Sequence, residues 1–385
     1  MITIRRILFL LILLGPATGA LGQKSRVLAV FQMIDQGKYT EAKENIELAV
    51  WNDKTSRWHR TYYAKGLLCQ TAYEDGYKKK DSKKTGLYPD QLYVAYDAYQ
   101  QALELDARKR LHTSVSHQYY LLSNDFRQLG EDQFSSKRYD EALRAFEYAL
   151  IVNQSKLINA KVDTSLVYNT AMAAYESKNW EKAIGYLTGL HDDAYEPAAS
   201  LLLYKAHLES GDSLRAEEVL MEGVKLYHYE NQAVVYLVNL LVRTERHQLA
   251  IEVLDEAIAQ RPDNFRFLWG RGLVYRRMGE FDKALPSFKA ALELSPEEPK
   301  IYYHIGVIYY NKGIDLTEKS LNIRDNDKYI VVKEEATAQY TEAVKWLEHS
   351  YELDPFSEKT ISRLYQLYYQ LQMTEKMETM KLLIE

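Results

Sequence analysis

The chain has 385 residues, of which 27% are charged, and its formal net charge is −5 at pH 7. This acidic balance is the opposite of the concentrated positive charge that nucleic-acid-binding proteins carry, so no nucleic-acid partner is expected. The single cysteine, Cys69, excludes an intramolecular disulfide and a cysteine-based zinc site, and its apolar surroundings (GLLCQTAY) predict a small buried side chain.

Residues 1–22 have the layout of a cleaved secretory signal peptide. Arg5 and Arg6 precede an apolar run at 7–14, and small residues at 20–22 supply a cleavage site ahead of Gln23. This run is too short to cross a bilayer, so membrane association is expected only through a partner. Without the two arginines, 47 Lys+Arg stand against 54 Asp+Glu, which gives the mature chain a net charge of −7.

The chain from residue 23 onward repeats itself with a period of 34 residues, which is typical of stacked helical repeats. The clearest copy contains Gly272, Tyr275, Phe281, Ala284, Phe288, Ala291 and Pro296. Val238 and Tyr204 hold the position of Gly272 one and two periods earlier, and further copies contain Ala171, Gly130 and Gly37. Each copy has two amphipathic stretches separated by a short turn such as MGEFD. One helix pair cannot bury its apolar face alone, so neighbouring pairs are expected to stack.

The stretch WGRGLVYRRMGEFDKALPSFKAALELSP resembles the tetratricopeptide repeat at nearly every defining position. The resemblance covers almost all of residues 23–385. It implies an all-α fold, a right-handed solenoid of stacked antiparallel helix pairs with about eight to nine repeats. The expected repeats are 23–56, 59–109 with an insertion, 123–156, 164–196, 197–230, 231–264, 265–298, 299–357 with an insertion, and 358–385 as a partial repeat.

Small and aromatic residues at the repeated positions are expected to form the core. Small residues such as Gly272 and Ala284 let two helices approach closely, and rings such as Phe288 fill the space beside them. Tyr275 and Ala291 belong to the same set. The chain has 32 tyrosines, and most of their rings are expected to pack between helices with the hydroxyl reaching water or a backbone carbonyl.

Two repeats carry insertions with a lysine-rich polar middle, at 74–94 and 314–342. Both are predicted to be elongated helix hairpins, with Pro89 and the segment 325–327 near their tips. Two alternatives remain for each insertion. It adds local packing, or it is a docking arm for a partner, since insertions in repeat proteins often lie on a binding face.

Solenoids bind ligands through the inner face of the first helix of each pair. The phase of the repeat predicts peptide- or protein-binding residues on that face: Arg266, Trp269, Arg276, Lys300, Tyr303, His304, Tyr310, Lys359 and Arg363. Positive charge alternates there with aromatic rings, which suits an acidic segment. Some members of the family clamp a terminal carboxylate, but Gly270 and His304 stand where that clamp needs asparagines. The other reading is solvated basic residues on exposed helices.

A search for catalytic patterns finds no zinc, nucleophile-elbow, phosphate-loop or dinucleotide motif, so we expect no catalytic residue, metal or cofactor. The sequence 212–214 (DSL) resembles a short O-glycosylation signal of exported Gram-negative proteins and favours a periplasmic location. The expected function is a non-enzymatic scaffold or adaptor of the bacterial envelope that binds other proteins or peptides, including acidic segments. A periplasmic peptide-binding co-chaperone is the alternative, and an envelope enzyme with an unrecognised site is the alternative from another class.

Overall fold

The computed structural model describes residues 22–158 and 160–384, and every regular element in that part of the chain is a helix. The chain divides into two compact units. Unit 1 comprises Met1–Tyr195 with Glu209–Gly211, and unit 2 comprises Glu196–Leu208 with Asp212–Glu385. The period of the sequence does not predict this division. The expected signal peptide lies, except for Gly22, outside the described residues.

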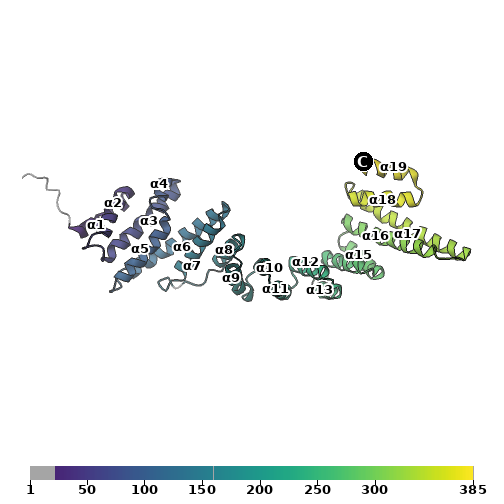
Figure 1. Cartoon of the computed structure of the whole chain (residues 1–385), viewed down its shortest axis with the longest axis horizontal. Helices are drawn as coiled ribbons and strands as arrows, with labels where there is room; N and C mark the ends of the chain where they lie inside the picture. Colours follow the sequence, from purple (N-terminus) through teal and green to yellow (C-terminus); the bar gives the residue numbers. More distant parts are fainter. Residues whose placement is uncertain (1–21, 159, 385) are drawn as a thin grey trace, which may run out of the picture. The chain divides into compact units, whose positions relative to one another are not determined.

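The helices follow one another in antiparallel pairs (Figure 1). Those of unit 1 are α1 (Gln23–Asp35), α2 (Tyr39–Val50), α3 (His59–Lys79), α4 (Ser82–Thr85), α5 (Gln91–Leu105), α6 (His112–Ser135), α7 (Tyr139–Asn153), α8 (Thr164–Glu176) and α9 (Trp180–Asp192). Those that follow are α10 (Pro197–Glu209), α11 (Ser213–Leu226), α12 (Asn231–Arg243), α13 (His247–Gln260), α14 (Phe265–Arg277), α15 (Phe281–Leu294), α16 (Pro299–Ser320), α17 (Asn326–Leu353), α18 (Glu358–Gln370) and α19 (Thr374–Ile384). Among the described helices, none has both the length and the apolar character of a membrane span.

Four consecutive turns between the two helices of a pair share one backbone geometry. The left-handed residue of each turn is Lys178, Gly211, Glu245 or Gly279, with φ values of 61°, 90°, 61° and 77°. The amide of the next residue then bonds a carbonyl of the preceding helix, as in the 2.8 Å bond from Arg246 N to Leu241 O. This arrangement satisfies carbonyls at the end of the first helix and starts the second.

The core of each pair consists of the small and aromatic residues that the period predicts. Ala284, Phe288 and Ala291 have no exposed surface. A methyl group built at Gly272 would lie 2.6 Å from the Cε1 atom of Phe288, because the ring packs directly on the α14 backbone. Tyr275 is half-buried at the edge of this cluster. The prediction of a core at these positions is confirmed.

Gly272→Ala is expected to destabilise unit 2, although alanine favours helices more than glycine does. The added methyl group cannot be accommodated unless the buried Phe288 ring moves, and overpacking of this kind costs roughly 1–3 kcal/mol. Urea unfolding followed by circular dichroism measures the change. Gly189→Ala on α9 is the matched control, since no atom lies within 4 Å of its Cβ position. The explanation fails if both variants gain stability.

The tyrosine hydroxyls differ from the expectation. Many bond to carboxylates and amides of neighbouring helices: Tyr88 to Glu47 (2.8 Å), Tyr99 to Gln70 (2.9 Å), Tyr229 to Glu256 (2.5 Å) and Tyr368 to Glu348 (2.8 Å). Tyr302, which donates to the Pro296 carbonyl at 2.9 Å, follows the expected pattern. A ring that spans the space between two helices brings its hydroxyl to the polar edge of the next helix, where long acidic side chains lie.

The first insertion adds local packing instead of projecting. Residues 80–90 fold back on α2 and α3, where the Lys43 ammonium donates to the Leu87 carbonyl at 2.6 Å. Lys84 pairs with Asp75 at 2.5 Å. A Cβ atom at Gly76 would lie 2.7 Å from that of Lys84, so the return is tight. The insertion therefore lengthens α3 to 21 residues, as an elongated hairpin requires, but its return packs locally and the predicted projection is wrong.

The second insertion does form an elongated hairpin, in which α16 (22 residues) lies alongside α17 (28 residues) (Figure 1). Asp325 caps α17 by accepting a hydrogen bond from the Lys328 amide at 3.0 Å, which places the turn where the sequence predicts it. The Tyr340 ring packs over Gly313, and its hydroxyl lies 3.0 Å from that of Thr317. The hairpin thus has a core of its own along part of its length.

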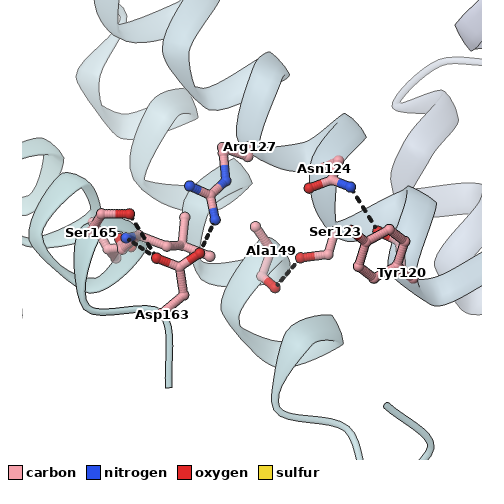
Figure 2. A network of polar contacts seen from close by, with 9 residues as sticks. Tyr120, Ser123, Asn124, Arg127, Ala149, Asp163 and Ser165 are labelled. Carbon is pink, nitrogen blue, oxygen red and sulfur yellow. Dashed lines mark hydrogen bonds and ion pairs between the residues drawn. The ribbon is translucent and has the colours of Figure 1, made fainter. Parts of the chain in front are cut away.

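In unit 1, polar contacts fix the entry to α8 (Figure 2). Arg127 of α6 forms an ion pair with Asp163, whose side chain caps the N-terminus of α8 and accepts a hydrogen bond from the Ser165 hydroxyl at 2.7 Å. Also on α6, the Ser123 hydroxyl donates to the Ala149 carbonyl of α7 at 3.1 Å. These contacts join α6, α7 and α8 across the loop before α8.

Candidate functional site

Three of the predicted binding residues lie on one side of α14. Arg266, Trp269 and Arg276 are three and seven residues apart, so they fall on a single helix face. The Asn264 side chain caps this helix by accepting a hydrogen bond from the Arg266 amide at 3.2 Å. The same asparagine donates to the Asn231 side chain at the start of α12 at 2.5 Å. The first turns of α12 and α14 are therefore held together.

His304 of α16 joins this face to the core. Its ring stacks on Phe288 with centroids 5.8 Å apart, and the Trp269 ring centroid is 6.3 Å away. Burial, together with the charges of Arg276 and Lys359, lowers the pKa of His304 to about 3. The imidazole is therefore neutral near pH 7.

Arg363 is held in place by its neighbours on α16 and α18. Its guanidinium carbon lies 4.4 Å from the centroid of the Tyr310 ring, and its Nη1 atom donates to Gln366 at 2.8 Å. Tyr310 in turn packs against Tyr340 of α17 at 5.9 Å. The structure thus assigns Tyr310 a supporting contact with the arginine and with the hairpin core.

We call the surface formed by Arg266, Trp269, Arg276, Tyr303, His304, Lys359 and Arg363 the basic face. Among the residues that the structure describes, four of its buried nitrogen atoms have no hydrogen-bond partner: Trp269 Nε1, Arg276 Nε, His304 Nδ1 and Arg363 Nε. Its arginines and lysine also form no ion pair with any described carboxylate, whereas Arg246, Arg271 and Lys312 nearby in the sequence all do. Burial lowers the pKa of Arg276, because no nearby carboxylate among the described residues stabilises its charged form.

Two cavities of about 560 Å³ each lie along these helices. The first, between α12 and α14, is lined by predicted residues Arg266, Trp269 and Arg276. The second, between α16, α18 and α19, is lined by Tyr303, Lys359 and Arg363. Lys300 is exposed in the first turn of α16 and lines neither cavity. The structure therefore groups Arg266, Trp269 and Arg276 at the first cavity and Tyr303, Lys359 and Arg363 at the second. His304 lies beside Trp269, and Tyr310 contacts Arg363.

The donor groups of the basic face have the chemistry to bind an anion. Guanidinium, indole and ammonium groups donate hydrogen bonds only, so their natural ligands are carboxylate or carbonyl oxygens. Within the described part of the chain, no group of three or more His, Cys, Asp or Glu side chains is arranged to hold a metal ion. Burial raises the pKa of the Cys69 thiol to about 12, so this cysteine is a poor nucleophile, and its predicted burial is confirmed.

The helical phase does not reveal the apolar part of the first cavity that α12 and α13 supply. Its lining there includes Val234, Val235, Val238, Val242 and Leu254. The signal was present in Gly270, which departs from the clamp pattern and lies two residues before the glycine that the core requires. Gly270 itself lines the cavity, so its missing side chain leaves that space unfilled.

A family model described as "Tetratricopeptide repeat" matches residues 127–199, 201–265, 235–299 and 270–314. A TPR repeat-containing protein of Methanocaldococcus jannaschii is 21% identical over 316 residues, which are 76% of this chain and 53% of the relative. The BBSome complex member BBS4 of Bos taurus is 22% identical over 191 residues, which are 49% of this chain and 35% of that protein. The chain thus spans about a third to a half of these relatives.

Two solved structures are also similar. A TPR repeats protein from Bacteroides fragilis NCTC 9343 is 19% identical, and the match covers 64% of this chain and 98% of that one with a TM-score of 0.34. MamA from Desulfovibrio magneticus RS-1 is 22% identical, and the match covers 49% and 97% of the two chains with a TM-score of 0.34.

Proposed function

We propose that this chain, which matches the tetratricopeptide-repeat model over residues 127–199 and 201–314, is a non-enzymatic scaffold that binds an acidic segment of a partner protein on the basic face of unit 2. Tetratricopeptide-repeat proteins generally mediate protein–protein interactions. The relative named as a BBSome complex member supports a place in a multi-protein assembly. The acidic chemistry of the partner is inferred from the basic face.

The observation that carries the proposal is the set of unpaired donors. A half-buried guanidinium such as that of Arg276 loses hydration without gaining a carboxylate, which lowers the stability of the free protein. A carboxylate placed against Arg276, Lys359 and the Trp269 indole would supply the missing acceptor. The hydrogen bonds and ion pairs formed with this carboxylate would then contribute favourably to the free energy of binding.

For the location, we propose the periplasm, on the layout of residues 1–22 and the DSL sequence at 212–214. The specific role proposed is that of an adaptor for an envelope complex. A peptide-binding co-chaperone is the second candidate, because an apolar cavity beside charged groups also suits unfolded segments. Co-purification separates the two roles, since an adaptor recovers a stoichiometric partner and a co-chaperone recovers diverse clients.

The double variant Lys359→Glu with Arg363→Glu tests the proposal. Random peptides displayed on phage are selected on the full chain, and the recovered peptides are resynthesised with a fluorescent label for anisotropy titration. We expect peptides rich in Asp and Glu, binding that weakens as salt rises, and at least a roughly tenfold loss of affinity in the variant. The melting temperature should fall only slightly, because the contact of Arg363 with Tyr310 contributes about 0.5–1 kcal/mol.

The matched control is Lys225→Glu with Lys289→Glu, which changes the net charge equally on the exposed surfaces of α11 and α15. This variant should bind like the natural chain. Equal loss in both variants would mean that overall charge, not the basic face, determines binding. Selection of peptides without acidic residues, or full affinity in the Lys359/Arg363 variant, would contradict the proposal.

A further inference from the structure

The cavity between α12 and α14 combines an apolar interior with a cationic rim. Valine side chains of α12 (Val234, Val238 and Val242) form one wall, and Leu254 of α13 and Leu273 of α14 contribute to the other lining. Arg266, Arg276 and Arg277 also line it, and in the described part of the chain none of the three is ion-paired. A water molecule in such an apolar space would find few hydrogen-bond partners.

Gly270 lines this cavity, and it has no side chain that could extend into the space. A Cβ atom at this position would lie 3.4 Å from Leu254 Cδ2, so a small side chain would fit with little adjustment. Gly272, two residues later, has the opposite requirement, because Phe288 occupies the place of its Cβ. Glycine is unfavourable in a helix interior. At position 270 the nearest atoms belong to Leu254 of α13, which also lines the cavity, so a larger side chain here would extend into the cavity.

Trp269 connects the cavity with the basic face. Its ring lines the cavity, lies near His304 and carries an indole nitrogen without a partner. Val235, which also lines the cavity, is 45% exposed, so the mouth opens to solvent. An occupant that entered here would meet apolar groups inside and arginines at the rim.

We infer that this cavity is the anchor pocket for a large apolar side chain, such as Phe, Leu or Trp, that is flanked by acidic residues in the partner segment. The inference rests on the proposed function of the basic face and specifies its ligand. The apolar side chain is buried against the valines of α12. The flanking carboxylates pair with the rim arginines, and the two parts together provide selectivity that charge alone does not supply.

Filling the cavity from within tests this assignment. In Gly270→Leu the new side chain occupies the space that the ligand needs, and in Gly270→Ala it occupies part of it. Gly189→Ala, on the exposed side of α9, is the control for improved helix propensity without any change in the cavity. We expect all three full-length variants to melt at the same temperature as the natural chain or higher.

The probes are three synthetic peptides that share one selected acidic sequence. The first keeps its bulky apolar residues, the second has alanine in their place, and the third has Gln and Asn in place of Glu and Asp. We expect the first peptide to bind at least about tenfold more tightly than the other two. Gly270→Leu should remove this advantage, Gly270→Ala should reduce it, and Gly189→Ala should leave it unchanged.

The outcomes distinguish the pocket from the proposed function. If the first two peptides bind equally and Gly270→Leu has no effect, the anchor pocket is wrong while an acidic segment still binds the basic face. If the third peptide binds as well as the first and the Lys359/Arg363 reversal has no effect, the proposed function is wrong. If Gly270→Leu abolishes the binding of a small apolar compound but leaves peptide binding unchanged, the cavity is a small-ligand site and not the anchor pocket.

Discussion

Ala284→Glu is expected to cause the largest loss of stability of any single change discussed in unit 2. Ala284 has no exposed surface and packs in the cluster of Leu268, Phe288 and Ala291 between α14, α15 and α16. A glutamate there must either bury a carboxylate without a partner or push the helices apart. A buried charge without a partner typically costs roughly 3 kcal/mol or more.

The effect should be local, because a repeat protein is coupled mainly through neighbouring pairs. Thermal unfolding by circular dichroism should show a lower midpoint or an early separate transition, and hydrogen exchange should place the lost protection in α14 to α16. Lys289→Glu on the same helix is the exposed control and should shift stability by no more than about 0.5 kcal/mol. An unchanged midpoint in Ala284→Glu would remove this residue from the core.

The second large effect is a pH-dependent loss of stability in unit 1. The Gln70 amide donates to Glu74 Oε1 at 3.1 Å and to Asp125 Oδ2 at 3.0 Å, so a single buried amide bridges carboxyls of α3 and α6. Burial first, and the negative charge of Glu74 second, raise the pKa of Asp125 to about 7. The hydrogen bond from Gln70 and the charge of Lys78 lower the pKa without cancelling these effects.

The sign follows from proton binding. Between the ordinary Asp value of 3.8 and about 7, the folded protein holds a proton on Asp125 that the unfolded chain has released. The contribution of this carboxyl is therefore most favourable below about pH 4 and is lost as pH rises toward 7, by as much as roughly 4 kcal/mol. Other groups add their own pH dependence, so the comparison must be made between variants.

Asp125→Asn should remove this component. The amide has the shape of the protonated carboxyl, can accept from Gln70 and can donate to Glu74. Urea unfolding at pH 5 and pH 8 should show that the variant gains stability over the natural chain mainly at pH 8. Asp97→Asn on the exposed side of α5 controls for the loss of one charge. A gain of equal size at both pH values would show that the carboxyl is not protonated in the folded chain.

The sequence predicts most of the fold because the determining contacts are local. Gly272 and Phe288 belong to one repeat, and their spacing recurs in the chain, so the pairing is readable without a structure. The return of residues 80–90 is different. It depends on Lys43 and Glu47 of the preceding helix, which meet Leu87 and Tyr88 about forty residues later, and no periodic signal records that contact.

The candidate site was predictable in part. Helical phase predicts that Trp269 and Arg276 share one face of α14, because such a prediction needs only the periodicity of one helix. The absence of counter-charges, the missing partners of their nitrogen atoms and the cavity beside Gly270 depend on three-dimensional neighbours. The buried contact between Gln70 and Asp125 also joins two repeats, so neither residue stands out in the sequence.

The left-handed turns bear on how such chains are recognised at all. Lys178 and Glu245 have the left-handed backbone conformation that Gly211 and Gly279 have in the neighbouring turns. Hydrogen bonding therefore determines the turn, and the residue type at this position can vary. The residue type at such a position says little about the fold, even though the backbone conformation there recurs from turn to turn. The information resides instead in pairs that exclude one another's atoms, such as Gly272 with Phe288. Distant relatives of this chain should therefore keep their small-residue and aromatic pairs long after their turns have become unrecognisable.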